Sequence, residues 1–557
     1  MELKRRLFKL SSYIRSFPGF IMEKDEGYLR RFTSSEWIEY ELWLFRHRGF
    51  TLHSLSEMYN TSRTFKIKPK ISIIMPVYNP APDEFYMAIR SVLWQSYPFW
   101  ELCLVDDASE SRSYLNALGR IRDKRIKVYF KESNSGIAET SQYALEKATG
   151  DYVALMDQDD ELYPDALYAF VRELQEKEID YFYSDRDMLS PNDRRYMHLF
   201  KPDWSPEYLL SFNYASHLEI YARHLVTEVG GFDSRYEGSQ DYDLVLKVAG
   251  NTEKVVHYPM VLYSWRQSQR SVAMEPGRKG YAFESGVRVV YDQLKRRNLP
   301  VREVFEDKDL WRGHYRITWD EEELAHEKIA LIAVGRSFEE RSRICSLVKQ
   351  YLNRFDVECF LSDYRVSDIN DTLRRIKAGR KVFFAVDAID TIVTPGMVDM
   401  LGYLRIDGVS VTGAKFYDGN RIFNVGISVS DSGKILLAYR NGAFEEKGYG
   451  AVASVPRNVS FVYPAFWCSP IGVLRQNGYL DEDCSYFLSC MRFYIKTVNL
   501  NERIVCVPYM GLNVDMGKTD YKADLEDLRE EISGTGFRDP YYNPNLTDIN
   551  EDFGIKL

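Results

Sequence analysis

The chain has 557 residues, of which 45% are hydrophobic and 28% are charged, and its formal net charge at pH 7 is −9. That length exceeds what a single hydrophobic core supports, so we expect several domains in a folded, globular protein. The acidic balance argues against a general nucleic-acid binder, which would carry a basic field.

Cysteine usage and hydropathy favour a cytoplasmic protein. The seven cysteines include no Cys-x-x-Cys pair and their number is odd, which fits reduced thiols and not a disulfide framework or a zinc site. No apolar run approaches the roughly 18 residues needed to cross a bilayer, and no signal peptide is visible.

Residues 1–65 are predicted to form a helical N-terminal segment. Its apolar face is expected to consist of Trp37, Tyr40, Leu42, Trp43 and Leu44. Residues 1–15 contain five basic side chains and one acidic one, and their leucine and isoleucine residues recur at helical spacing. Two interpretations remain open for residues 1–15. They form either a basic amphipathic helix that contacts the inner face of the cell membrane, or a helix packed on the body of the protein.

Strand-like and helix-like segments alternate after a basic linker at residues 66–70. The predicted strands are residues 71–77, 101–105, 126–130 and 152–156, and the predicted helices between them are residues 83–95 and 137–150. This alternation predicts an α/β domain over residues 66–300, with a mostly parallel sheet and helices on both faces. In such sheets ligands bind beyond the carboxyl ends of the strands. Polar clusters lie at three of these ends: Tyr78-Asn79, Asp106-Asp107 and Asp157–Asp160.

The most informative of these clusters is Asp157-Gln158-Asp159-Asp160, which directly follows the apolar run at residues 152–156. Three carboxylates at the end of a buried strand repel one another unless a cation is shared among them. Oxygen-only ligands of this kind suit Mg²⁺ or Mn²⁺. The alternative is a solvated turn that caps the helix opened by Pro164.

Landmarks of the first domain recur later in the chain at near-constant spacing. The run that ends at Pro164 has a counterpart that ends at Pro395, and Gly231-Phe232 is echoed by Gly478-Tyr479. Two copies of one domain in tandem are therefore expected, the second over residues 325–515, with a C-terminal helix and extended tail at residues 516–557.

The second copy lacks the acidic residues that catalysis would need. When the two prolines are aligned, Asp157 falls on Ala388 and only Asp390 remains of the acidic cluster. Residues 484–501, near the counterpart of Asp241, contain no Asp or Glu. We interpret the second copy as catalytically empty, with a structural or acceptor-positioning role or a role in homodimer formation.

Six segments in fixed order resemble family 2 glycosyltransferases, which have the GT-A nucleotide-diphospho-sugar fold. These segments are residues 71–79, 91–97, 101–109, 135–137, 156–160 and 240–243. The chain looks like the two-domain bacterial members that build O-antigens, capsules and other cell-wall polysaccharides. The resemblance is strong in the first copy and faint in the second, and it implies two GT-A domains in tandem.

The resemblance implies an inverting, metal-dependent transfer of a hexosyl or deoxyhexosyl group. The donor would be a UDP- or dTDP-sugar, and the acceptor a hydroxyl of a growing, lipid-linked surface polysaccharide. By match to the family motifs, Asp241 is the general base, and Asp157 and Asp159 hold Mn²⁺ or Mg²⁺. The expected nucleotide-sugar contacts are Pro76, Tyr78, Asn79, Asp107, Gly136, Asp157 and Gln158. The expected acceptor contacts are Gln240, Trp204 and Trp265.

A simpler structural role stands beside several of these assignments. Asp107 could cap the turn that follows it, and Asp241 could complement a helix dipole. Trp204 and Trp265 are of a residue type that is more often core than sugar platform. His217 and His257 are expected to be structural histidines with their hydrogen bonds satisfied.

Two departures from the family pattern are visible. Gln240 stands where many relatives carry Glu, so a single acid is available at the base position. Ser268 stands where many relatives carry His, which puts a histidine contribution to metal or phosphate binding in doubt.

Two other functions are possible for a chain of this composition and predicted fold. A dinucleotide-dependent oxidoreductase would need Gly-x-Gly-x-x-Gly after the first strand, but Val77 is followed by Tyr-Asn-Pro-Ala. The stronger alternative is a non-catalytic carbohydrate-binding or scaffold protein of a polysaccharide assembly complex. The intact acids of the first copy argue against it.

Overall fold

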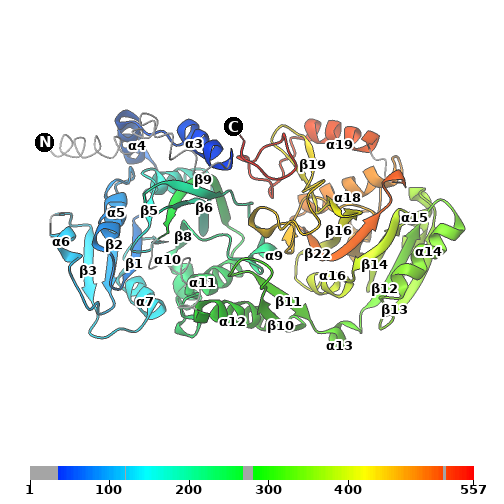
Figure 1. Cartoon of the computed structure of the whole chain (residues 1–557), viewed down its shortest axis with the longest axis horizontal. Helices are drawn as coiled ribbons and strands as arrows, with labels where there is room; N and C mark the ends of the chain where they lie inside the picture. The colour runs from blue at the N-terminus through cyan, green and yellow to red at the C-terminus, as the bar shows by residue number, and fades with distance from the viewer. Residues whose placement is uncertain (1–34, 120, 268–279, 519–521, 557) are drawn as a thin grey trace. The chain divides into compact units, whose positions relative to one another are not determined.

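The structure is a computed structural model that describes residues 35–119, 121–267, 280–518 and 522–556 (Figure 1). The predicted basic helix at residues 1–15 lies outside the described residues, as does Ser268. Within the described part of the chain, no helix is both long enough and apolar enough to span a bilayer.

Contacts divide the chain into two compact units. The first contains the described residues up to Lys201, residues 215–289 and the C-terminal residues from Ile555. The second contains residues 202–214 and 290–554. The short segment 202–214 falls inside the range predicted for the first domain but packs with the second unit. The predicted boundaries at 66–300 and 325–515 stay predictions.

The first unit is built on a nine-stranded mixed sheet. Its strand order is β3 (Ile126–Phe130), β2 (Trp100–Asp106), β1 (Ile71–Val77), β4 (Tyr152–Leu155), β8 (Glu219–Ala222), β6 (Tyr181–Leu189), β9 (Val255–Arg266) and β5 (Glu161–Leu162), and β7 (Arg195–Leu199) pairs with β6. Strands β3, β2, β1 and β4 are parallel, as predicted. The sheet becomes mixed beyond β4 because β8 runs antiparallel to both β4 and β6, whereas β9 is parallel to β6.

Helices cover both faces of this sheet, and the alternation of side chains along the strands explains the two layers. Ile71, Ile73, Met75 and Val77 share one buried cluster with the apolar faces of α5 (Pro82–Leu93) and α8 (Ala166–Glu173). Helix α7 (Ile137–Lys147) packs against β1 and β2 but contributes nothing to that cluster. Successive strand residues point to opposite faces, so α7 covers the other side of the sheet.

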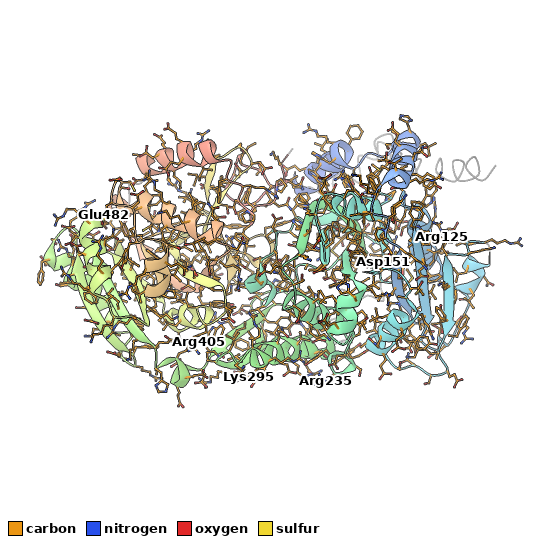
Figure 2. All side chains as sticks on the ribbon, turned by 180° about the vertical axis from the view of Figure 1, so that it is seen from behind. Arg125, Asp151, Arg235, Lys295, Arg405 and Glu482 are labelled. Atoms are coloured by element: carbon orange, nitrogen blue, oxygen red, sulfur yellow. The ribbon has the colours of Figure 1, made fainter. Side chains whose placement is uncertain are left out.

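The remaining helices of this unit are short or lie at its borders: α6 (Leu115–Leu118), α10 (Arg223–Glu228), η1 (Ser234–Tyr236), α11 (Gln240–Ala249) and α12 (Gly280–Arg296). Exposed charged side chains lie on the outside of both units. Figure 2 labels several of them: Asp151, Arg235, Lys295, Arg405 and Glu482.

The described part of the N-terminal segment is helical, as predicted. It forms α3 (Ser35–His47) and α4 (Leu52–Thr64), and Thr51 and Ser54 cap α4 reciprocally. Tyr40, Trp43 and Leu44 are buried, but Leu42 is 44% exposed. The prediction for Leu42 was wrong, because a residue two positions from Tyr40 on a helix faces away from the buried stripe.

The second unit repeats the first strand by strand. Its order is β13 (Asp356–Ser362), β12 (Lys328–Val334), β14 (Arg380–Val386), β21 (Phe466–Pro470), β16 (Val409–Asp418), β22 (Arg503–Val514) and β15 (Ile389–Thr394), and β17 (Arg421–Asn424) pairs with β16. These strands correspond in turn to β2, β1, β4, β8, β6, β9, β5 and β7. Every pairing keeps its parallel or antiparallel sense. The predicted tandem duplication of an α/β domain is confirmed.

Strand β3 has no counterpart in the second sheet, and β20 (Arg457–Asn458) is the added strand there. The other elements of the second unit are α9 (Pro206–Leu209), β10 (Val301–Glu306), β11 (Tyr315–Trp319), α13 (Glu321–Leu324), α14 (Phe338–Lys349), α15 (Val366–Arg375), α16 (Met397–Tyr403), β18 (Ile427–Val429), β19 (Ile435–Leu437), η2 (Tyr449–Ala451), α17 (Ile471–Gln476), α18 (Tyr486–Asn499), η3 (Met516–Lys518) and α19 (Lys522–Thr535).

Candidate functional site

The carboxyl end of β1 presents an exposed aromatic ring on a fixed backbone. Tyr78 is 44% exposed. Its backbone N–H donates to Gln158 Oε1 at 2.9 Å, and its carbonyl accepts from Gln158 Nε2 at 3.2 Å. The next residue, Asn79, has φ +45° and accepts from the Glu110 N–H through Oδ1 at 2.9 Å. The predicted residues Tyr78, Asn79 and Gln158 therefore lie together. Pro76 precedes them in β1, half-buried.

Asp107 follows β2 and organises the loop before α7. Its carboxylate accepts from the backbone N–H groups of Ser135 (3.0 Å) and Gly136 (2.9 Å), and Lys131 Nζ lies 3.2 Å away. These contacts hold a loop 28 residues further along the chain and do not cap the turn that follows Asp107; in that turn the Ser109 N–H donates to Asp106 at 2.8 Å. A contact between Asp107 and a nucleobase stays a prediction.

Position 136 requires glycine because the Glu237 carboxylate lies close to its backbone, a contact that the sequence did not reveal. It has φ +90°, and a Cβ added there would lie 2.5 Å from Glu237 Oε1. The Glu237 carboxylate accepts from the N–H groups of Ile137 (2.7 Å) and Ala138 (3.0 Å). A helix N-terminus favours an anion, and here the protein supplies that anion itself. Glu237 thereby joins the start of α7 to the segment just before α11, the helix that carries Asp241.

The acidic loop divides into one buried and two half-buried carboxylates. Asp160 is fully buried, and its two oxygens accept from Tyr263 Oη (2.6 Å) and from the Arg266 N–H (2.7 Å). Burial and the charges of Asp159 and Asp157 raise the pKa of Asp160 well above its usual range. Asp160 therefore supports the loop from inside the protein. Asp157 and Asp159 remain half-buried beside it.

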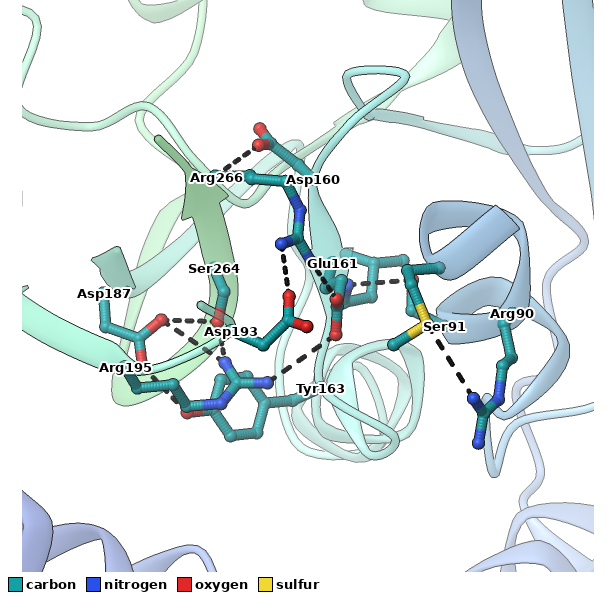
Figure 3. A network of polar contacts seen from close by, with 12 residues as sticks. Arg90, Ser91, Asp160, Glu161, Tyr163, Asp187, Asp193, Arg195, Ser264 and Arg266 are labelled. Carbon is teal, nitrogen blue, oxygen red and sulfur yellow. Dashed lines mark hydrogen bonds and ion pairs between the residues drawn. The ribbon is translucent and has the colours of Figure 1, made fainter. Parts of the chain in front are cut away.

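A mostly buried network of charged side chains holds the residues next to the acidic loop (Figure 3). Arg266 pairs with Glu161, which follows Asp160 directly, and also with Asp193. Arg195 lies 3.4 Å from Asp187 and 3.9 Å from Glu161. No sequence motif singled out Arg266, although it is the last residue of β9 and stands at the same sheet edge as the acids.

Asp241 lies in the first turn of α11 and is half-buried. Burial raises its pKa, and the backbone N–H of Tyr242 acts in the opposite direction. Asp243 pairs with Lys247 at 2.7 Å, so this acid is already engaged one helical turn along.

A second acid that the sequence did not reveal lies near Asp241. Glu219, at the start of β8, is fully buried and accepts from the hydroxyls of Tyr181 (2.8 Å) and Tyr221 (2.7 Å). Burial and the charge of Asp241 raise the pKa of Glu219 to about 7. Asp241 is therefore close enough to the start of β8 to act on it electrostatically.

The pairing of β4 with β8 relates the acidic loop to Asp241. Ala154 pairs with Ile220 in antiparallel register, so β8 begins where β4 ends. The acidic loop leaves the end of β4, and Asp241 acts on Glu219 at the start of β8. The two predicted acid positions thus lie at the same end of the sheet.

The three residues predicted to contact the acceptor differ in their burial and in the unit to which they belong. Gln240 is 9% exposed, and its Oε1 has no hydrogen-bond partner among the described residues. Trp265 is half-buried against the core, with the Arg186 guanidinium 5.2 Å from its ring centroid, which fits the core alternative. Trp204 falls in the segment 202–214, which packs with the second unit. A contact between either tryptophan and a saccharide stays a prediction.

The two histidines also differ. His257 Nε2 lies 2.8 Å from Asp185 Oδ1, so this ring is satisfied, as expected. His217 stacks on Tyr263, but its Nδ1 is buried without a partner in the described structure. The expectation of a satisfied structural histidine was therefore wrong for His217.

The acidic loop suits a divalent ion that also takes ligands from a substrate. Within the described residues, no group of three or more His, Cys, Asp or Glu side chains is arranged to hold a metal ion. The Asp157 and Asp159 pair supplies two carboxylates, and Mg²⁺ is usually bound by one or two carboxylates, waters and substrate phosphates. The donor set therefore fits Mg²⁺ or Mn²⁺ bound together with a diphosphate.

The second unit fills the corresponding position with its own side chains. Asp387, directly after β14, is 1% exposed. It accepts from the Arg336 N–H at 2.9 Å and from Tyr364 Oη at 2.6 Å. Arg343 donates to the carbonyls of Asp387 (2.8 Å) and Ile389 (2.9 Å). Asp387 directly precedes Ala388, the residue that aligns with Asp157, and its carboxylate is already engaged within the chain.

Comparison with known proteins agrees with these observations. The family model described as glycosyl transferase family 2 matches residues 72–226. WcaA of Escherichia coli, whose name assigns it to colanic acid biosynthesis as a glycosyl transferase, is 30% identical over 215 residues, which cover 36% of this chain and 74% of WcaA. The chain therefore belongs to glycosyltransferase family 2.

Two further relatives extend the comparison. The uncharacterized protein y4gI of Sinorhizobium fredii is 28% identical over 530 residues, or 87% of this chain and 58% of that protein. The O-antigen biosynthesis protein RfbC of Myxococcus xanthus is 31% identical over 235 residues, or 41% of this chain and 18% of that protein. The chain thus spans little more than half of the first relative and less than a fifth of the second.

Proposed function

We propose that the first unit is an inverting, metal-dependent glycosyltransferase that extends a bacterial surface polysaccharide. The donor is a UDP- or dTDP-sugar, and the acceptor is a hydroxyl of a lipid-linked saccharide. The observation that carries the proposal is the convergence at one sheet edge of the Asp157 and Asp159 pair with Asp241. The names of the relatives RfbC and WcaA support a role in polysaccharide assembly.

In this mechanism the exposed ring of Tyr78 stacks on the nucleobase, while Gln158 fixes the Tyr78 backbone. Asp157 and Asp159 would hold Mn²⁺ or Mg²⁺, and the bound ion would supply Lewis-acid stabilisation of the negative charge on the leaving diphosphate. Asp241 accepts the proton of the acceptor hydroxyl as that oxygen attacks the anomeric carbon.

The environment of Asp241 suits a general base. A carboxylate is already deprotonated at neutral pH, and a raised pKa makes it a stronger proton acceptor. Gln240, with its buried and unpartnered Oε1, can accept a hydrogen bond from the acceptor saccharide. A covalent mechanism would need a second carboxylate nucleophile, and Asp243 is paired with Lys247.

The test is a screen of UDP- and dTDP-sugars with lipid-linked saccharide acceptors, in which nucleotide release is monitored with and without Mn²⁺. Transfer that requires the metal and gives an inverted product supports the proposal. Nucleotide binding that is indifferent to metal, with no transfer for any donor, would favour a non-catalytic scaffold instead.

A further inference from the structure

His217 lies in the loop directly before β8, two residues ahead of Glu219. Because β8 begins where β4 ends, this loop passes on the side of the acidic loop. Lys201 Nζ holds the loop backbone through the carbonyls of Ala215 (2.7 Å) and His217 (2.9 Å). Lys201 is fully buried, so the position of the His217 backbone is fixed from inside the protein.

The Tyr263 ring lies between the His217 ring and the acidic loop. It stacks on Tyr263 with a centroid distance of 5.0 Å and an interplanar angle of 26°. Tyr263 Oη donates to Asp160 Oδ2 at 2.6 Å and accepts from the Asp157 N–H at 3.3 Å. One tyrosine therefore positions both the His217 imidazole and the loop that carries Asp157.

The protonation of this ring follows from its surroundings. Burial, with the nearby charges of Lys201 and Arg186, lowers the pKa of His217 to about 3, so the imidazole is neutral near pH 7. A neutral imidazole carries one N–H and one lone pair. Nδ1 is enclosed without a partner, and leaving a buried N–H donor unsatisfied is costly. The proton is therefore placed on Nε2, on the other side of a half-buried ring.

We propose that His217 is a donor-binding residue, whose Nε2–H donates a hydrogen bond to an oxygen of the bound nucleotide sugar. This inference rests on the proposed function and adds a residue to that site. The recognised group is an oxygen acceptor on the diphosphate or on the transferred sugar. A neutral donor suits a position beside the metal carboxylates, because it adds no positive charge that would compete with the cation.

Three substitutions separate this role from a packing role. In His217→Phe the aromatic stack on Tyr263 is kept and the N–H is lost. In His217→Gln the amide reaches the position of Nε2, and in His217→Asn it reaches only that of Nδ1. His224→Phe is the matched control, because that histidine is exposed. Thermal unfolding of each variant reports whether the fold is intact.

The measurements are KM for the nucleotide sugar and the Kd values of the nucleoside diphosphate and the nucleotide sugar, each with Mn²⁺. We expect His217→Phe and His217→Asn to weaken nucleotide-sugar binding about tenfold, and His217→Gln to restore most of it. Weaker binding of the nucleoside diphosphate as well would place the contact on the phosphates. Unchanged diphosphate binding would place it on the sugar.

Unchanged KM and Kd values in a folded His217→Phe or His217→Asn variant would overturn the inference. An equal loss in the Gln variant would do the same, because it would indicate a packing role. Wild-type protein that transfers no sugar from any donor would instead overturn the proposed function, so the two failures are distinguishable.

Discussion

The two sheets share one topology but differ at the carboxyl ends of the matching strands β4 and β14. In the first unit, Asp157 and Asp159 stay half-buried, and one buried acid, Asp160, takes the supporting hydrogen bonds. In the second unit, Asp387 is buried and fully engaged by Arg336 and Tyr364. The difference teaches that a duplicated fold can keep its strand order while the acid directly after the matching strand becomes buried and engaged within the chain.

The second unit does contain an open cavity, but different residues line it. A cavity of about 510 Å³ is lined in part by Asp390, Asp418 and Asp515. Asp390 aligns with Asp159 when Pro164 and Pro395 are matched. No counterpart of Asp241 stands beside it, because residues 484–501 contain no acid.

The largest expected effect is the loss of the base in the first unit. Asp241→Asn should lower kcat by about 10² to 10⁴-fold, because it removes the proton acceptor while keeping the size of the side chain. Asp387→Asn in the second unit should leave kcat unchanged. Substantial transfer by Asp241→Asn would break the comparison, because the second unit would then have to be active.

The same comparison extends to metal binding. Asp159→Asn should weaken the binding of a nucleotide sugar in the presence of Mn²⁺ by about 10 to 100-fold, an effect of the size seen when metal sites are disturbed. Asp390→Asn, at the aligned position of the second unit, is the matched control and should have no effect. Calorimetric titration with and without EDTA measures both variants, and equal losses would contradict the assignment.

Glu219 provides a test of stability. Its pKa of about 7 in the folded protein lies above the ordinary value of 4.5, so the folded state holds the proton to higher pH than the unfolded state. The resulting stability is fully present below about pH 4.5 and is lost as pH rises through 7. Glu219→Gln, which stays neutral, should therefore stabilise the first unit at pH 8 by up to about 3 kcal/mol.

Denaturant unfolding at pH 5 and pH 8 measures this effect. The gain should be present at pH 8 and nearly absent at pH 5. An equal gain at both pH values would show that the pKa of Glu219 is not raised in the folded state.

The smallest expected effect concerns two glycines with similar backbone geometry. Gly136→Ala should destabilise the first unit by about 1–3 kcal/mol, because the new Cβ meets the Glu237 carboxylate at 2.5 Å and φ is +90°. Gly379→Ala is the matched control, since φ is +82° but the added Cβ meets nothing within 4 Å. Its cost should be about 1 kcal/mol. Equal costs in thermal unfolding would show that the Glu237 contact contributes nothing.

Much of the fold followed from local patterns in the sequence. The strand at residues 126–130 was predicted with the observed bounds, and the spaced prolines revealed the duplication. The mixed half of each sheet was not predicted, because β8 and β6 return without the regular alternation of strand and helix. Periodicity alone does not give the order in which such strands pair.

The sequence predicted residues of the candidate site only where several side chains of one chemical type are adjacent in the chain. The carboxylates at Asp157 and Asp159 stand out in the sequence because their repulsion demands a partner. Glu237 and Arg266 do not, because each acts through a contact with a residue distant in the chain. Such contacts exist only once the topology is known.

The burial of Asp387 among partners within the second unit has a thermodynamic consequence. A ligand stabilises only the state to which it binds, so nucleotide and metal should raise the melting temperature of the first unit, roughly with the logarithm of their free concentration. The Asp387 carboxylate already has its partners within the chain, so the melting of the second unit should not respond. A two-step melting profile in which only one transition shifts as nucleotide is added would be the calorimetric signature of this division.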